Sequence, residues 1–127
     1  MRKWGILTGF ILWIFLTLLF TSTAEAQTVL TKKGGVNYFK GTKETYYNLD
    51  MTRIYAKADA NFGTWHKKWT RDDGVKMYGP YVVLAVPFDV YPYGTTDIPC
   101  SLGLGIALDT GAFAESCKNQ IDVAVDW

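Results

Sequence analysis

Two aspartates in the last quarter of the sequence stand where charged side chains are costly. Asp109 ends the apolar run 105–108, and Asp122 lies inside the apolar, partly β-branched run 121–125. Burying a carboxylate costs several kcal/mol unless the charge is paired, hydrogen-bonded or neutralised. The placement therefore predicts that Asp109 and Asp122 do chemistry, although the Asp-Thr-Gly run at 109–111 is a weak signal by itself.

These side chains must be positioned by strands. We expect strands over 102–108 and 121–125, and a strand over 81–86 that is buried on both faces, as in a closed barrel. Alternation of larger apolar and polar residues over 44–56 predicts one further extended strand. Outside the first 26 residues no segment shows a sustained helical period, so we expect an all-β domain.

The start of the chain has the form of a secretory signal peptide. Arg2 and Lys3 precede an apolar run over 6–20, and a small-x-small site ends at Ala26. We expect cleavage of residues 1–26 and a secreted protein that is extracellular or associated with the cell wall. The alternative is a retained anchor, and membrane contact is expected only through such an uncleaved segment. The next stretch, 27–43, is polar and glycine-bearing, and we expect it to be flexible.

The charge of the mature chain excludes one class of function. Removing residues 1–26 takes Arg2, Lys3 and Glu25 from 13 basic and 12 acidic residues and leaves 11 of each. Nucleic-acid binding depends on clustered Lys and Arg that neutralise phosphates, so we exclude it. A neutral sugar polymer remains compatible with the composition. With one histidine and no ligand-like cysteine spacing, we expect no metal site and no cofactor.

Two cysteines, Cys100 and Cys117, remain in the exported chain. An even count in an oxidising compartment favours a disulfide, which would close a loop around the 109–111 turn. Such a loop is worth about 3 kcal/mol in the chain-entropy model. The alternative is two unpaired thiols, because the strand over 102–108 first carries the chain away from Cys100.

Trp65 and Trp69 lie four residues apart beside lysines. Large flat rings with a polar handle suit sugar ligands, so the pair could form a stacking platform. The alternative is that one of the two tryptophans covers the end of a barrel. His66 between them has a side chain suited to acid–base work, but we favour a plain surface histidine.

Three motifs follow one another in the second half of the chain: Pro-Tyr-Gly-Thr at 92–95, Asp-Thr-Gly at 109–111 and Ile-Asp at 121–122. Their order and context resemble the 3D domain, a family of secreted double-psi β-barrels named for three aspartates and related to the barrel of murein lytic transglycosylases. The resemblance covers about 46–127 and implies a six-stranded double-psi β-barrel over 44–127.

The resemblance also implies an activity, cleavage of peptidoglycan glycan strands by a lytic transglycosylase, and a monomer. Asp122 matches the acid/base, and its apolar neighbours would raise its pKa. Asp109 would orient the site and tune Asp122, with Thr110 and Gly111 supplying hydrogen bonds to the substrate at the turn. The alternative for Asp109 is that it caps a turn without taking part in catalysis.

Two departures from the family pattern motivate a second functional hypothesis. Pro87 stands where the family has its first aspartate, with Asp89 two residues later, and the spacing between Asp109 and Asp122 is about two residues longer than usual. The alternative is therefore a non-catalytic module that binds peptidoglycan or serves a structural role. A small protein for interaction with another protein is a third possibility.

Overall fold

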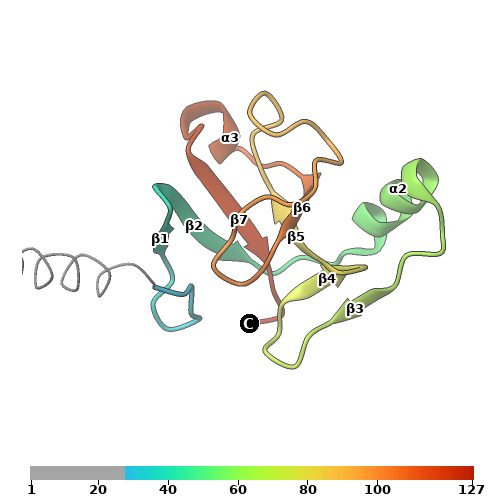
Figure 1. The fold of residues 1–127 in the computed structure, drawn as a ribbon, viewed down its shortest axis with the longest axis horizontal. Coiled ribbons are helices and arrows are strands. Elements are labelled where there is room, and N and C mark those ends of the chain that lie inside the picture. Colours follow the sequence, from blue (N-terminus) through green and yellow to red (C-terminus); the bar gives the residue numbers. More distant parts are fainter. Residues whose placement is uncertain (1–27) are drawn as a thin grey trace, which may run out of the picture.

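A computed structural model describes residues 28–127, so the expected signal peptide lies outside the described residues (Figure 1). The elements in chain order are β1 (Asn37–Phe39), β2 (Thr42–Tyr47), α2 (Thr52–Phe62), β3 (Lys68–Thr70), β4 (Lys76–Tyr78), β5 (Tyr81–Ala85), β6 (Gly105–Asp109), α3 (Phe113–Ser116) and β7 (Gln120–Ala124). Within 28–127, no helix has the length and apolar character needed to cross a bilayer.

The seven strands form one mixed sheet in the order β1-β2-β7-β5-β4-β3. Strand β5 pairs with β4 near its start and with β7 near its end, and it also pairs with β6, which lies off this order. Two of the pairs, β2–β7 and β5–β6, are parallel, and the remaining pairs are antiparallel. The fold is thus mostly β, as expected. The pairings among the described strands do not close into a ring, so the expected closed barrel of six strands is not what this pairing forms.

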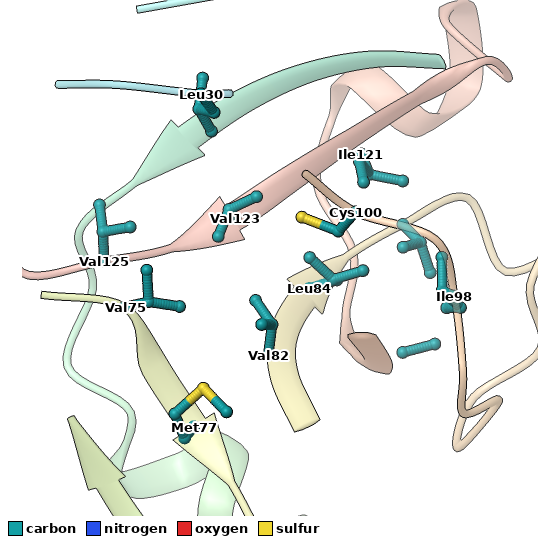
Figure 2. Close-up of a cluster of buried hydrophobic side chains, with 12 residues drawn as sticks. Leu30, Val75, Met77, Val82, Leu84, Ile98, Cys100, Ile121, Val123 and Val125 are labelled. Carbon is teal, nitrogen blue, oxygen red and sulfur yellow. The ribbon is translucent and has the colours of Figure 1, made fainter. Parts of the chain in front are cut away.

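Strand β5 is buried on both faces, which confirms the prediction from its apolar run. Val82 and Leu84 point into one apolar cluster, and Val83 points into a second on the opposite face. Figure 2 shows the first cluster, in which side chains from β5 and β7 meet Cys100 and Ile98 of the β5–β6 connection. Alternation along β5 therefore gives the sheet an apolar layer on each side.

Helix α2 corrects the prediction of one extended strand over 44–56. The strand ends at Tyr47, and the helix begins at Thr52, where Asp50 Oδ1 accepts hydrogen bonds from the Thr52 backbone N–H at 2.9 Å and hydroxyl at 2.6 Å. Partly or fully buried Ile54, Ala58 and Phe62 recur at four-residue spacing, which is a helical stripe. This stripe packs on the second cluster, so the domain is not all-β.

Residues 28–43, within the segment 27–43 that we expected to be flexible, contribute to the folded domain. Residues 37–39 form β1, and Leu30 is buried in the first cluster. Lys40 and Gly41 both have positive φ, which suits the tight turn joining β1 to β2. The folded unit therefore begins before residue 44.

Candidate active site

The two aspartates are brought together by one residue of β5. Ala85 is the register partner of Asp109 on β6 and of Asp122 on β7. Register partners in neighbouring strands point to the same side of a sheet, so the two carboxylates share one side, with the Ala85 methyl between them. Two strand spacings separate their backbones, which is about 10 Å in a flat sheet.

A β-bulge in β6 places Asp109 on that side. Leu84 pairs with Ala107 but Ala85 pairs with Asp109, so Leu108 is the extra residue. In regular alternation Asp109 would follow Ala107 into the first cluster. Because a bulge shifts the alternation by one residue, Asp109 instead lies beside Leu108 on the face that carries α2.

Strand β2 supplies a hydrogen-bond donor to each carboxylate. The Thr45 hydroxyl donates to Asp122 Oδ1 at 3.0 Å, and the Tyr47 hydroxyl donates to Asp109 Oδ2 at 3.0 Å. Thr45 and Tyr47 are two residues apart and therefore face the same side of the strand. Asp109 Oδ1 also accepts the Thr110 backbone N–H at 2.9 Å, the turn-capping contact that was the alternative for this residue.

The environment shifts the pKa of Asp122 in the direction needed by an acid. Burial raises the pKa of Asp122, the Thr45 hydrogen bond opposes the increase, and the charge of Asp109 adds to it. The pKa of Tyr47 is also raised, first by burial and then by Asp109, so this phenol stays protonated and donates. The pKa shift of Asp122 was expected from its apolar neighbours, whereas the contribution of Tyr47 was not.

A groove of about 660 Å³ opens beside Asp109. One wall is α2 and the residues before it, with Asp50, Thr52, Arg53, Ile54 and Lys57. The other wall is formed by Phe88, Leu108, Asp109 and Thr110. Asp122 is half-buried and does not line this groove.

The groove has cations that the sequence did not reveal as site residues. Arg53 and Lys57 are exposed on successive turns of α2 and face Asp109 across the groove. Lys57 Nζ lies 4.4 Å from the centroid of the Tyr93 ring, and no ion pair within residues 28–127 involves either cation. Both are free to meet an anionic ligand.

The two tryptophans of the predicted stacking platform have different surroundings in the structure. Trp69 is half-buried against the first cluster, and its indole N–H donates to the Gly79 carbonyl at 2.9 Å, which is a packing role. Trp65 is 80% exposed and stacks on His66 with ring centroids 3.6 Å apart. Trp65 and Tyr78 line a separate pocket of about 200 Å³. Neither tryptophan lines the groove beside Asp109.

His66 is not a plain surface residue. Its ring is half-buried between Trp65 and Tyr78, and its Nδ1 lies 2.9 Å from the Gly63 carbonyl and 3.1 Å from the Tyr78 hydroxyl. These contacts hold the turn after α2 against β4. The contacts thus give His66 a packing role, and the residue lines the smaller pocket and not the groove beside Asp109.

The predicted disulfide is not formed in this structure. Cys100 is buried among apolar side chains, as Figure 2 shows, and Cys117 is exposed after α3. Of the two other residues predicted at the turn, Thr110 lines the groove, while the Gly111 carbonyl accepts the Ala114 backbone N–H and begins α3. Residues 28–127 contain no cluster of three or more potential metal-binding side chains of His, Cys, Asp or Glu.

Comparisons with family models, curated proteins and solved structures found no match. Thr45 and Tyr47 could have been found from the sequence, because they alternate along a strand whose other face carries Glu44. Arg53 and Lys57 could not, because α2 itself was not predicted.

Proposed function

We propose that this protein is a secreted, monomeric cell-wall enzyme that cleaves peptidoglycan glycan strands as a lytic transglycosylase. The observation that carries the proposal is the placement of Asp109 and Asp122 on either side of Ala85, with the pKa of Asp122 raised. Paired carboxyl groups whose environments differ are typical of acid–base sites.

One carboxyl group is sufficient for this chemistry. Asp122 donates its proton to the glycosidic oxygen as the bond from that oxygen to C1 of N-acetylmuramic acid breaks. Its carboxylate then removes the proton from the C6 hydroxyl of the same sugar as that oxygen bonds to C1. The product is a 1,6-anhydro sugar, no water is consumed, and Asp122 regains its proton. Asp109, held by Tyr47, orients the site, and its charge adds to the burial that raises the pKa of Asp122.

Two cations on the α2 wall of the groove fit the substrate. Peptidoglycan carries short peptides with carboxylates on its muramic acid residues, and Arg53 and Lys57 lie across the groove from Asp109. A glycan strand seated against β6 would present these carboxylates to α2. Trp65, with its exposed ring, is the proposed stacking site for a sugar further along the strand.

We also propose that the sheet is a variant of the double-psi β-barrel. Two parallel pairs, β2–β7 and β5–β6, joined through the antiparallel β5–β7 pair, support this assignment. The Val75–Val125 bridge adds a contact between the residue before β4 and the residue after β7. Together these contacts curl the sheet around the first cluster.

The test is incubation of the mature chain with purified peptidoglycan, followed by mass spectrometry of the soluble products. Anhydro-muropeptides are expected, and Asp122→Asn should reduce their release by at least about a hundredfold. Asp72→Asn, at an exposed position away from the groove, is the matched control. Products with free reducing ends would show hydrolysis instead, and no release at all would refute an enzyme.

A peptidoglycan-binding module without catalysis is the second candidate. Two observations favour it: Pro87 replaces the family's first aspartate, and Asp122 does not line the groove. Such a protein would sediment with insoluble cell wall and release nothing from it. Sedimentation and product release measured on the same sample separate the two functions.

A further inference from the structure

Positive charge is concentrated at the start of the described chain. Residues 28–43 contain four lysines, Lys32, Lys33, Lys40 and Lys43, and no acidic residue or arginine. Residues 44–127 contain seven basic and eleven acidic residues, so their formal net charge is −4. The near-neutral total thus conceals a domain with a positive end and a negative remainder.

Exposed apolar side chains lie in the same stretch. Tyr38 is 67% exposed, Val29 54% and Val36 47%, so three of the seven large apolar side chains most exposed in the described structure fall within sixteen residues. Two hydrogen bonds, Asn37 Nδ2 to the Thr28 carbonyl at 3.2 Å and the Thr28 hydroxyl to the Tyr38 carbonyl at 3.3 Å, hold residue 28 beside β1.

One lysine and one exposed aromatic residue share a side of the β1–β2 pair, and the other three lysines lie in the adjoining turns. Tyr38 and Lys43 are register partners in the β1–β2 pair and point to the same side, away from buried Asn37 and Glu44. Lys40 lies at the tip of the turn between these strands, and Lys32 and Lys33 lie in the turn before β1. We call this set of four lysines with Val29, Val36 and Tyr38 the N-terminal face.

The four lysines have no anionic partner within residues 28–127. The ion pairs there involve Lys68, Arg71 and Lys118. Glu44, the acidic residue nearest in sequence, points inward and is bound by Asn37 and Ser101. The N-terminal face therefore presents unneutralised positive charge around exposed apolar groups.

We propose that the N-terminal face docks on an anionic membrane surface. Lysines near such a surface are attracted to anionic headgroups, and aromatic and aliphatic side chains between them can enter the interface. The position in the chain agrees, because the apolar run over 6–20 precedes this face by only a few residues. Docking would hold the domain at the membrane after the signal peptide has been removed.

A soluble polyanion is the competing ligand, and the apolar residues argue against it. Polyanion binding needs only the lysines, whereas Val36 and Tyr38 add affinity only if they leave water. The proposal does not depend on the proposed enzyme activity, since it concerns a face on β1 and β2, away from α2 and β6, and it has its own readout.

The test is co-sedimentation of the mature chain, expected to begin at Gln27, with vesicles of equal parts phosphatidylglycerol and phosphatidylcholine, and with vesicles of phosphatidylcholine alone. Binding to the anionic vesicles only, weakened by salt, is expected. The double variant Lys32→Gln, Lys33→Gln should lower the partition coefficient roughly 25-fold, at about fivefold per lysine. Circular dichroism verifies that each variant is folded.

Two comparisons make the test decisive. Lys67→Gln with Lys118→Gln removes the same charge from exposed positions elsewhere, and an equal loss of binding would refute a specific face. Val36→Ser with Tyr38→Ser should also weaken vesicle binding. If this variant binds vesicles as the wild type does, the proposal is overturned in favour of a polyanion; failure of the wild type to bind anionic vesicles overturns it outright.

Discussion

Asp122 is half-buried beside a second acidic group, and this arrangement is costly for folding when Asp122 is ionised. Because burial raises its pKa, the folded protein holds the proton more tightly than the unfolded chain does. The contribution of Asp122 to stability is therefore fully present at low pH and is lost as the pH rises from about 3.9, the ordinary pKa of Asp, through the higher folded pKa.

Asp122→Asn should relieve this destabilisation. The variant keeps an oxygen that can accept the Thr45 hydroxyl and carries no charge at any pH. We expect its melting temperature relative to the wild type to be higher at pH 7 than at pH 3, measured by thermal unfolding. Asp72→Asn should show no such trend. A melting-temperature difference between Asp122→Asn and the wild type that is the same at both pH values would contradict the raised pKa of Asp122.

The two cysteines should differ in reactivity. Burial raises the pKa of Cys100 to about 12, whereas Cys117 is exposed. Thiolates are the reactive form, so native protein should take up one equivalent of iodoacetamide, at Cys117, and unfolded protein two. Peptide mass spectrometry of non-reduced protein identifies the labelled positions. No labelling in either state would instead establish the disulfide predicted from the sequence.

At the scale of single residues, sequence reasoning located the pair of aspartates but not their surroundings. Asp109 and Asp122 were recognisable because each interrupts an apolar strand. The placement of both on one side of the sheet depends on the bulge at Leu108. The sequence did not predict this bulge, because the Gly, Ala, Ile and Leu residues around it are compatible with regular alternation. Which of Trp65 and Trp69 packs on the core stayed open in the sequence, because the exposure of a tryptophan cannot be read from its neighbours.

Among the elements, β1 and β2 are fixed by a buried carboxylate. Glu44 is fully buried and accepts hydrogen bonds from Asn37 Nδ2 at 2.8 Å, from the Ser101 backbone N–H at 2.8 Å and from the Ser101 hydroxyl at 2.6 Å. Glu44 thus joins the first two strands to the loop before β6.

Glu44→Gln should destabilise the domain by about 2 kcal/mol. The substituted amide places an NH2 group against one of the Ser101 donors, and the remaining hydrogen bonds lose the assistance of a charge. Urea unfolding measures the change, with Glu115→Gln on the exposed side of α3 as the control. An unchanged unfolding midpoint would show that the three hydrogen bonds add nothing to stability.

The elements were predicted unevenly for identifiable reasons. Strands β5 and β7 were clear because their apolar runs are short and β-branched. Helix α2 was missed because Ile54 and Tyr55 resemble strand residues, and because tertiary packing of Ala58 on the second cluster outweighs that local preference. Strand β1 was missed because glycines and lysines around it suggested a loop.

For the molecule as a whole, the proposed peptidoglycan activity and the groove between α2 and β6 together predict which form of the glycan is preferred. Arg53→Gln with Lys57→Gln should weaken sedimentation with intact cell wall and have little effect on glycan strands stripped of their peptides, because only the intact wall carries the matching carboxylates. Measuring both in the Asp122→Asn background separates binding from cleavage. Equal losses of binding to both substrates would indicate that Arg53 and Lys57 contact the sugar instead of the peptide carboxylates.

The place of β7 in the sheet has a consequence for how the protein is made. This strand lies between β2 and β5, and the Thr45–Asp122 contact joins residues 77 positions apart. Before residues 120–124 have emerged, β2 has no partner on its inner edge and neither apolar cluster is complete. Because these contacts join residues far apart in the sequence, the domain cannot complete its folding until its last strand is available.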